Sequence, residues 1–524
     1  MKTYLDYLNE LSIDDLRIGL LKHGMFADKL PDFLTMEDFY SFCEKHDFNI
    51  KYTSNDGWDY VRFNNMRNSN VPRELGIPTP FAYFNLCECI ITNWESILNH
   101  FYEKTSAEIY KRSQIHIQKR NSGPHLFEMS THYKDVDDDL QEIITEQPIS
   151  KQYCVQTDIS TCFPSIYSHA LPWALVGKRV AKSTRKNDSL WYNKLDKSSR
   201  HLKYNETSGL LIGPHTSNLL SEIILTTVDS ELNNYQYVRY IDDITYYASD
   251  ENEANKFLKD LSKVLKRYDL SLNAKKTNIT KIGLHYDTSW KNQLNAFYIG
   301  DDKNSEGKIV FHHARLRAYV DLATSLVESN DNNAAIFTYV IKKISGYHLG
   351  KKARLYYVNT LHHLLLLYPY LIRWCDEYLF VAFSVDIAKI HDIAKQLYIL
   401  GVNTNNFEAC SYAIYWSIKY KFSLSDLDIV KNAIDSEDCI LLMLTYIKCN
   451  HVGDGDGQNK LIEFAKKIVS ADEIDRYWIF VYEVLPADEL KKEYKKLKKQ
   501  KISFLKSEFK LVKKNKHSRF ADIN

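Results

Sequence analysis

The sequence predicts an α+β region in the middle of the chain, followed by an all-helical region. Between residues 150 and 300, short runs rich in β-branched and aromatic residues alternate with runs of helical periodicity. Beyond about residue 310 the helical period dominates, and from 359 to 450 the only helix breakers are Pro369 and Gly401. We therefore expect an N-terminal helical segment over 1–70, a mixed domain over 71–305, and an all-helical, repeat-like domain over 306–524.

The size and composition are those of a globular protein with more than one core. The chain has 524 residues, of which 44% are hydrophobic and 26% are charged. Its formal net charge is only +1, so the average carries no nucleic-acid signature. The end of the chain, from 491 to 519, is strongly basic, and we interpret this run as a solvated helix or a frayed tail.

Nothing in the sequence predicts a membrane span or an oxidising compartment. The richest apolar stretch, 361–383, is interrupted by charged residues. The nine cysteines are an odd number, and no two have the Cys-x-x-Cys spacing of a metal or redox site. We expect a reduced, cytoplasmic protein that has no membrane partner.

The individual elements follow from local patterns. Residues 1–50 and 81–110 have helical spacing, whereas 51–80 mixes Asn, Gly and Pro and is expected to be loop. Strands are expected at 153–157, on both sides of residue 242, and in a run that ends at Gly300. Helices are expected from Pro164 through His169 and over 252–268. The stretch 451–459 is interpreted as a loop.

Two acidic elements carry the chemistry. Asp158 ends the strand candidate 153–157, and Asp242 and Asp243 are adjacent between two β-rich runs. Since side chains of a strand alternate between its faces, one strand cannot aim both adjacent carboxylates to one side, but a tight hairpin turn can. Two carboxylates at a hairpin tip repel each other and favour a bound cation. Mg²⁺ ions between this tip and Asp158 fit in-line phosphoryl transfer.

An Asp-Asp pair in a turn is common, so the pattern is specific only through its companions. A glycine-containing loop, 209–218, leads into an apolar helix between the two acidic elements, and a Leu-Asn…Lys-Thr segment follows them. With these companions the sequence resembles the reverse-transcriptase family. The segments similar to its motifs A to D are, in order, 158–163, 209–217, 240–243 and 272–277.

This resemblance implies a fold of fingers and palm and a role for each matching residue. It implies two Mg²⁺ ions, or Mn²⁺, held by Asp158, Asp242, Asp243 and the backbone carbonyl of Ile159. The implied nucleotide-binding residues are Ile159, Phe163, Gly213 and Ser217. The aromatic ring of Phe163 would lie beneath the sugar and exclude a 2′-hydroxyl, and Lys276 would protonate the leaving pyrophosphate.

Departures from the family pattern point to one branch of it. Leu211 and Ile212 occupy the positions where template-copying relatives have Pro-Gln, and no basic fingers motif stands out, with Lys119, Arg120 and Lys151 as candidates. The chain in this respect resembles the abortive-infection (Abi) branch of bacterial reverse transcriptases, the AbiK-like enzymes, whose helical domain replaces a thumb. That resemblance implies anti-phage defence, template-independent DNA synthesis from dNTPs, single-stranded DNA primed on and covalently attached to protein, and homo-oligomers.

Two other functions remain open from the sequence alone. One is an RNA-templated reverse transcriptase of retron or group II intron type. The other is a palm that has lost catalysis and serves as a scaffold with a helical protein-binding domain. The three retained carboxylates favour an enzyme over the scaffold, because like charges without a cation are unfavourable.

Overall fold

The computed structural model describes residues 4–45, 57–67, 71–107, 112–113, 148–282 and 289–512. These residues form two compact units, and each is described by itself. Unit 1 comprises 1–28, 35–61 and 75–286, and unit 2 comprises 29–34, 62–74 and 287–524. The polypeptide therefore contributes two short N-terminal segments to a unit that is otherwise built from the second half of the sequence.

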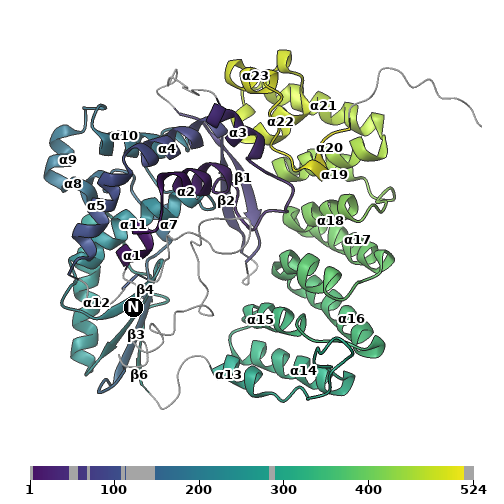
Figure 1. Cartoon of the computed structure of the whole chain (residues 1–524), viewed down its shortest axis with the longest axis horizontal. Coiled ribbons are helices and arrows are strands. Elements are labelled where there is room, and N and C mark those ends of the chain that lie inside the picture. Colours follow the sequence, from purple (N-terminus) through teal and green to yellow (C-terminus); the bar gives the residue numbers. More distant parts are fainter. Residues whose placement is uncertain are drawn as a thin grey trace, which may run out of the picture. The chain divides into compact units, whose positions relative to one another are not determined.

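Unit 1 contains a four-stranded antiparallel sheet, seen at the lower left of Figure 1. Its strand order is β4-β5-β3-β6, with bounds β3 Tyr153–Asp158, β4 Tyr237–Tyr240, β5 Asp243–Ala248 and β6 Asn278–Lys281. Strand β3 lies between β5 and β6, and Asp158 at its end is directly opposite Asp243 at the start of β5. Tyr240 pairs with Asp243, so the β4–β5 hairpin turns within two residues, Ile241 and Asp242. The predicted strands on both sides of the acidic pair are confirmed.

Most of unit 1 is helical, and α12, Glu251–Leu265, packs on the sheet. The predicted helix over 252–268 is present as α12, with a short 3-10 turn at Lys266–Tyr268. Asp250 caps it by accepting from the Glu253 amide, and Phe257 packs on Tyr246 of the sheet. The other helical elements are α1 Tyr4–Asn9, α2 Ile13–Arg17, a π-helical turn Ile18–Lys22, α3 Glu37–Lys45, α4 Pro80–Thr92, α5 Trp94–Thr105, α7 Cys162–Ser165, α8 Ala170–Val176, α9 Lys178–Thr184, α10 Trp191–His201 and α11 His215–Ser230.

The central helix of unit 1 is α11. Fourteen of its sixteen residues are buried, among them Glu222 and Asp229. A helix that is buried on all sides must satisfy its polar side chains internally. This requirement brings two carboxylates next to the β4–β5 hairpin, as described below.

The prediction of loop over 51–80 is wrong for part of this stretch. Residues Tyr60–Asn65 form β1 and residues Arg73–Pro78 form β2, and the two strands pair with each other. Alternating burial along β1 shows why, since every second side chain is buried while Arg62 and Asn64 are exposed. Of the asparagines that suggested a loop, Asn64 lies on the exposed face, and Asn65 is buried, where it bonds to Glu408.

Three local predictions are also corrected. The helix expected from Pro164 through His169 ends at Ser165, and a separate helix, α8, begins at Ala170. The strand expected to end at Gly300 is absent from the described residues, because 289–296 form α13 and residues 297–300 are irregular. The loop expected over 451–459 is limited to Gly453 and Asp454, which caps the next helix.

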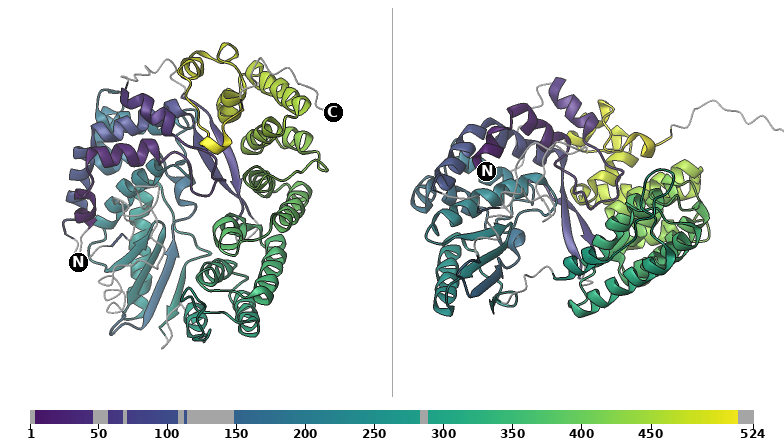
Figure 2. Two further views of the ribbon diagram at one scale, coloured as in Figure 1. Left: turned by 45° about the vertical axis from the view of Figure 1, so that its right-hand side comes forward. Right: turned by 60° about the horizontal axis from the view of Figure 1, so that its bottom comes forward.

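Unit 2 is built from helices that follow one another in chain order (Figure 2). The predicted helices over 387–400 and 409–420 are confirmed as α17, Ile387–Thr404, and α18, Phe407–Lys419, which pack on each other. Helix α18 in turn packs on α20, and α20 packs on α21 and α22. The remaining elements are α13 Ser289–Ala296, α14 His313–Ser329, α15 Ala335–Ile344, α16 Lys351–Leu367, a 3-10 segment Pro369–Trp374, a π-helical turn Asp376–Val381, α19 Ile429–Ser436, α20 Cys439–Val452, α21 Gly455–Ser470, α22 Trp478–Val484 and α23 Lys492–Lys499.

Part of the basic C-terminal run is integrated into unit 2. Lys498 lies on α23 and donates to the carbonyl oxygens of Tyr482 and Glu483, at 2.6 and 3.0 Å. Lys495 pairs with Asp488 at 2.9 Å. The interpretation of a solvated or frayed run is therefore incorrect for Lys498. The Lys495–Asp488 pair is exposed, as that interpretation expects, and residues 513–519 lie outside the described part of the chain.

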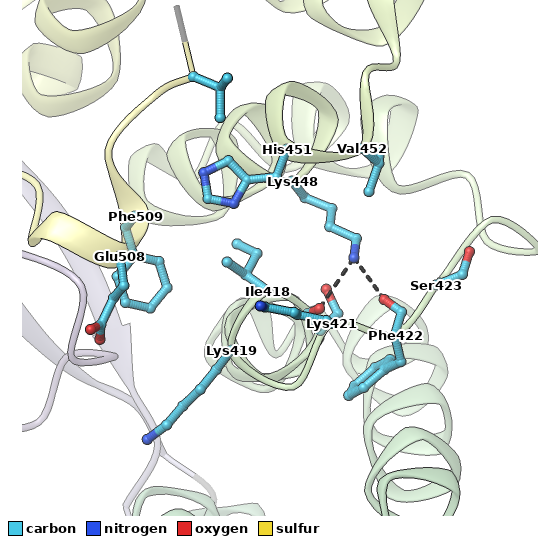
Figure 3. Close-up of a pocket in the computed structure, with 12 residues that line it drawn as sticks. Ile418, Lys419, Lys421, Phe422, Ser423, Lys448, His451, Val452, Glu508 and Phe509 are labelled. Atoms are coloured by element: carbon cyan, nitrogen blue, oxygen red, sulfur yellow. Dashed lines mark hydrogen bonds between the residues drawn. The ribbon is translucent and has the colours of Figure 1, made fainter.

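A cavity of about 710 Å³ lies in unit 2 beside the ends of α18 and α20 (Figure 3). Lys448 lines it, is only 6% exposed, and donates to the carbonyl oxygens of Ser417 and Phe422 at 3.2 and 2.6 Å. Burial lowers the pKa of this lysine. The carbonyls at the C-terminal end of a helix attract a cation, so Lys448 serves as a cap of α18.

The N-terminal part of unit 2 is joined to α18 through a buried carboxylate. Glu408 accepts from the side chain of Asn65 and the backbone amide of Met66, both at 2.6 Å. Burial raises the pKa of Glu408 to about 7, although these hydrogen bonds and the charges of Arg373 and Lys29 favour the ionised form. The carboxyl group therefore ionises near neutral pH inside the folded unit.

This raised pKa predicts a pH-dependent stability. Between about pH 4.5 and 7 the folded unit binds a proton that the unfolded chain has released, so stability falls as pH rises through this window. The total loss is about 3 kcal/mol. Glu408→Gln keeps the shape and, after a flip of the Asn65 amide, both hydrogen bonds, so we expect it to remove this slope. Hydrogen exchange of α18 amides at pH 5, 6 and 7, corrected for the intrinsic exchange rate at each pH, measures this slope, with the exposed Glu463→Gln as control. Equal slopes in the wild type and Glu408→Gln would contradict the assignment.

No helix within the described ranges is long and apolar enough to cross a membrane.

Candidate active site

The three acidic residues singled out from the sequence lie at one edge of the sheet, where the inner strand β3 ends and the inner strand β5 begins. Asp158 and Asp243 are opposite each other on neighbouring strands, so their side chains share one face. Asp242 is the second residue of the hairpin turn, and its carbonyl oxygen accepts from the backbone amide of Ile159 at 3.1 Å. The structure therefore brings together Asp158, Ile159, Asp242 and Asp243.

The hairpin turn has an unusual backbone. Ile241 has a φ of 55°, in the left-handed region that glycine or asparagine usually occupies in such turns. A β-branched residue in this conformation is strained, and it persists only where surrounding contacts hold it. This strain coincides with the position of the acidic pair.

A second loop presents Lys276 to the same edge. The backbone amide of Asn273 donates to the carbonyl oxygen of Asp158 at 2.9 Å, and the hydroxyls of Thr277 and Thr157 are 2.7 Å apart. These contacts fix the 271–277 loop along the end of β3. Lys276 Nζ lies 2.5 Å from Asp158 Oδ2, with 60% of the lysine side chain exposed.

The electrostatics of this edge favour a cation. Asp158 is 4% exposed, and its Oδ1 has no hydrogen-bond partner among the described residues. Desolvation and the neighbouring Asp242 carboxylate raise the pKa of Asp243 above its ordinary value. Buried carboxylate oxygens without partners are costly, and hard divalent cations bind such oxygens. The donor set therefore fits Mg²⁺ or Mn²⁺.

The side chains do not yet form a closed metal site. In the described part of the chain, no three acidic, His or Cys side chains converge closely enough to hold an ion. One oxygen of Asp158 faces the Lys276 ammonium instead. A rotation of the carboxylates at fixed backbone positions would be needed to bring them around one ion.

The predicted nucleotide-binding residues Phe163, Gly213 and Ser217 lie on α7, on the loop before α11 and on the start of α11. Phe163 is half-buried on α7, and its carbonyl oxygen accepts from the Leu210 amide at 2.8 Å. This bond joins α7 to the loop that precedes α11. Gly213 in that loop has a φ of 130°, which favours glycine, and Ser217 is buried in the first turn of α11.

Of the three candidate basic residues of the fingers, Lys151 lies within the described residues, and it contacts residues outside the candidate site. Lys151 pairs with Ser249 and Glu253, at 3.0 and 3.6 Å. Lys119 and Arg120 lie outside the described residues. The positions that replace the Pro-Gln of template-copying relatives are packed on β2, where the Ile212 carbonyl accepts from the Gly76 amide and Leu211 is buried.

The comparison with known families agrees with this geometry. Residues 88–302 match the family of reverse transcriptases (RNA-dependent DNA polymerases). The chain contains a reverse transcriptase domain. The match includes the four-stranded sheet, α11 and all the candidate site residues. No curated protein matches the chain.

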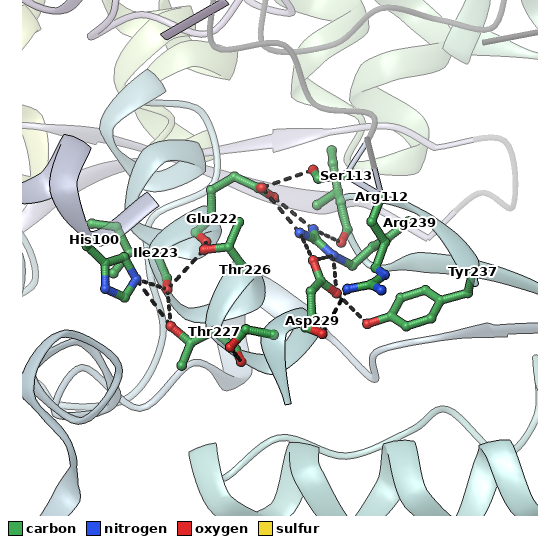
Figure 4. Close-up of polar contacts among 12 residues, drawn as sticks. His100, Arg112, Ser113, Glu222, Ile223, Thr226, Thr227, Asp229, Tyr237 and Arg239 are labelled. Atoms are coloured by element: carbon green, nitrogen blue, oxygen red, sulfur yellow. Dashed lines mark hydrogen bonds and ion pairs between the residues drawn. The ribbon is translucent and has the colours of Figure 1, made fainter. Parts of the chain in front are cut away.

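The reverse transcriptase domain also contains polar residues that the sequence patterns did not reveal. Arg239 precedes the hairpin turn and is 1% exposed, between Glu222 and Asp229 of α11 (Figure 4). A signal for the partners of Arg239 is present in the sequence: two acidic residues seven positions apart are the only carboxylates of α11, and this spacing places both on one face. Their link to the hairpin depends on the tertiary structure.

Proposed function

We propose that this chain is a divalent-metal-dependent DNA polymerase that extends a protein hydroxyl without a template and acts in abortive-infection defence against phage. The observation that carries the catalytic part is the register of Asp158 and Asp243 on neighbouring strands with Asp242 at the hairpin tip. The reverse transcriptase match supports a nucleotidyltransferase acting on nucleotides and a nucleic acid. Template independence, protein priming, homo-oligomers and the defence role are the finer part of the proposal.

Each of the candidate site residues has a role in the proposed reaction. Asp158, Asp242 and Asp243, with the Ile159 carbonyl, would hold two Mg²⁺ ions, which supply Lewis-acid stabilisation of the charge on the transferring phosphoryl group. Lys276 holds a proton close to these carboxylates and is the proposed donor to the leaving pyrophosphate. Gly213 and Ser217 belong to the loop and helix start proposed to hold the nucleotide.

The substitution of Leu211 and Ile212 supports template independence. A template-copying site needs polar contacts that read or seat a nucleotide against its pairing partner. Here Leu211 is buried, and the Ile212 carbonyl bonds to Gly76. At these two positions the loop carries aliphatic side chains, whereas relatives that copy a template carry proline and glutamine.

A single set of incubations tests the polymerase proposal. The purified chain is incubated with Mg²⁺ and one labelled dNTP at a time, with and without an RNA or DNA template. Label on the protein in denaturing gels, removable by protease, is the expected result. Free product that requires an RNA template would instead favour a retron-type or group II-type enzyme. No incorporation under any condition would overturn the polymerase and favour the scaffold.

The defence role is tested in cells. Bacteria that express the wild-type chain or Asp242→Asn are challenged with a panel of phages. We expect fewer plaques with the wild type only. Equal protection by both variants would separate defence from DNA synthesis.

Phe163 is proposed to exclude ribonucleotides. We expect Phe163→Ala to raise the incorporation of rNTP relative to dNTP, because removal of the ring makes room for a 2′-hydroxyl. The matched control is Tyr167→Ala, another half-buried aromatic of the same segment, which packs on His169 and Trp173. It should lose comparable stability without a change in sugar selectivity. An unchanged rNTP/dNTP ratio in folded Phe163→Ala would argue against a gate.

A further inference from the structure

A fully buried arginine connects the hairpin turn to α11 (Figure 4). Arg239 donates through Nε to Asp229, at 3.0 and 3.2 Å, and through Nη2 to Asp229 at 2.7 Å and Glu222 at 3.2 Å. Its Nη1 donates to Glu222 at 2.8 Å and to the carbonyl oxygen of Ile241 at 3.0 Å. The five N–H groups of a guanidinium are thereby all accounted for.

The charges around Arg239 are balanced by further buried groups. Ser113 donates to Glu222 at 3.0 Å, and the Tyr237 hydroxyl donates to Asp229 at 2.6 Å. Arg112 is 3% exposed and donates to the backbone carbonyls of Asp229 and Tyr235, at 2.9 and 3.1 Å. Inside unit 1, Arg239 therefore faces two carboxylates, and Arg112 bonds to the backbone beside one of them. Such a network fixes its members, because any displacement leaves a buried charge without a partner.

Arg239 connects this network directly to the catalytic turn. The Ile241 carbonyl, held by Arg239, belongs to the peptide that leads directly into Asp242. The other side of Asp242 is held by the bond from the Ile159 amide to the Asp242 carbonyl. Since Ile241 is in a strained left-handed conformation, these two bonds define the orientation of the peptides that carry the acidic pair.

We propose that Arg239 is a positioning residue for metal binding. The α11 carboxylates fix its guanidinium, the guanidinium holds the Ile241 carbonyl, and this bond orients Asp242 and Asp243 toward Asp158. This inference rests on the proposed function of the site. It also links the acidic pair to α11, whose first turn carries the proposed nucleotide-binding residue Ser217. Supporting groups of this kind typically change metal affinity by about 10- to 100-fold.

The decisive variant is Arg239→Lys. Lysine keeps the positive charge between Glu222 and Asp229, but its single ammonium cannot hold both carboxylates and the Ile241 carbonyl in one plane. The matched control is Arg112→Lys, which makes the same change at an equally buried site of the same network. The Arg112 side chain donates to the backbone carbonyls of Asp229 and Tyr235.

Mn²⁺ binding to the full-length chain, followed by electron paramagnetic resonance, gives a readout that does not require turnover. The Mn²⁺ binding that remains in Asp242→Asn serves as the background, because this variant lacks a proposed metal ligand. We expect Arg239→Lys to weaken Mn²⁺ binding about 10- to 100-fold and Arg112→Lys to leave it within about threefold. The apparent Mg²⁺ requirement for dNTP incorporation should rise in parallel in Arg239→Lys, and both variants should show similar thermal melting.

The results separate positioning from general stability. Equal Mn²⁺ affinity in Arg239→Lys and the wild type, or equal weakening in both lysine variants, overturns the proposal. If Arg239→Lys does not fold, Glu222→Asp replaces it, because it keeps every charge while withdrawing the support of Nη1. Unchanged Mn²⁺ affinity in that variant also overturns the proposal. A wild type that binds Mn²⁺ without incorporating dNTP would refute the polymerase function and leave the role of Arg239 to be decided by the binding data.

Discussion

Asp242→Asn should reduce nucleotide incorporation by about a hundredfold or more while the fold is retained. Asparagine has nearly the same shape but no negative charge, so it removes a metal ligand and the charge stabilisation that the metal provides in the transition state. The turn can accept the change, because asparagine is common in hairpin loops. Asp158→Asn should have an effect of the same size, since Asp158 is opposite Asp243 in the sheet. Single-turnover incorporation of labelled dNTP measures both losses.

A neutralised aspartate away from the site serves as the control. Asp188 is 60% exposed and pairs with Lys197, so Asp188→Asn should incorporate nucleotide at the wild-type rate. Circular dichroism establishes that each variant is folded. Wild-type incorporation by folded Asp242→Asn would remove this residue from the metal site.

Asp229→Ala should destabilise the reverse transcriptase domain by about 3–5 kcal/mol. The substitution leaves the buried Arg239 with one carboxylate where it had two, and it leaves the Tyr237 hydroxyl without its acceptor. Because the chain has two units, a single denaturation midpoint does not report this loss. Hydrogen exchange of α11 amides, followed by mass spectrometry, gives the local free energy of opening.

Glu231→Ala is the matched control, two residues further along the chain. Glu231 is also paired, with Arg267 and with the Tyr268 hydroxyl, but the Arg267 side chain is 56% exposed. An ion pair in contact with water contributes about 1 kcal/mol or less. Similar losses in both variants would show that the buried network contributes no more than an exposed pair.

The sequence predicted the parts of the domain whose signals are local. Runs rich in β-branched and aromatic residues located β4 and β5, and the adjacency of Asp242 and Asp243 required a turn between them. Helical spacing located α11, α12, α17 and α18. These elements could be predicted because each pattern extends over enough residues to distinguish a period of two from one of 3.6.

Short helices, and strands with one buried and one exposed face, could not be predicted in this way. Strand β1 was missed because its exposed face carries Arg62 and Asn64, which are also loop-type residues. Helix α13 was missed because the strand-like aromatic residues 297 and 298 follow it directly. In these cases contacts with distant segments decide the conformation, and local propensity is a weak guide.

In the candidate site, too, local patterns could be predicted and contacts between distant segments could not. Asp158, Asp242 and Asp243 are recognisable by type and spacing, whereas the support of their turn is not. Arg239 has its partners on α11, and only the folded unit places a strand arginine against a helix face that carries Glu222 and Asp229. The pairing of Lys276 with Asp158 likewise depends on a loop fixed along β3.

The division of the chain between the two units has a consequence for synthesis on the ribosome. Asn65 and Met66 belong to unit 2 and bond to Glu408, which is made 343 residues after Asn65. At a translation rate of about 5–20 residues per second, Glu408 is synthesised roughly 20–70 s after the 62–74 segment. The nascent chain therefore exposes this segment for most of its translation. A gene fragment that ends near residue 286 would leave it permanently exposed, so the two units are not separable by simple truncation.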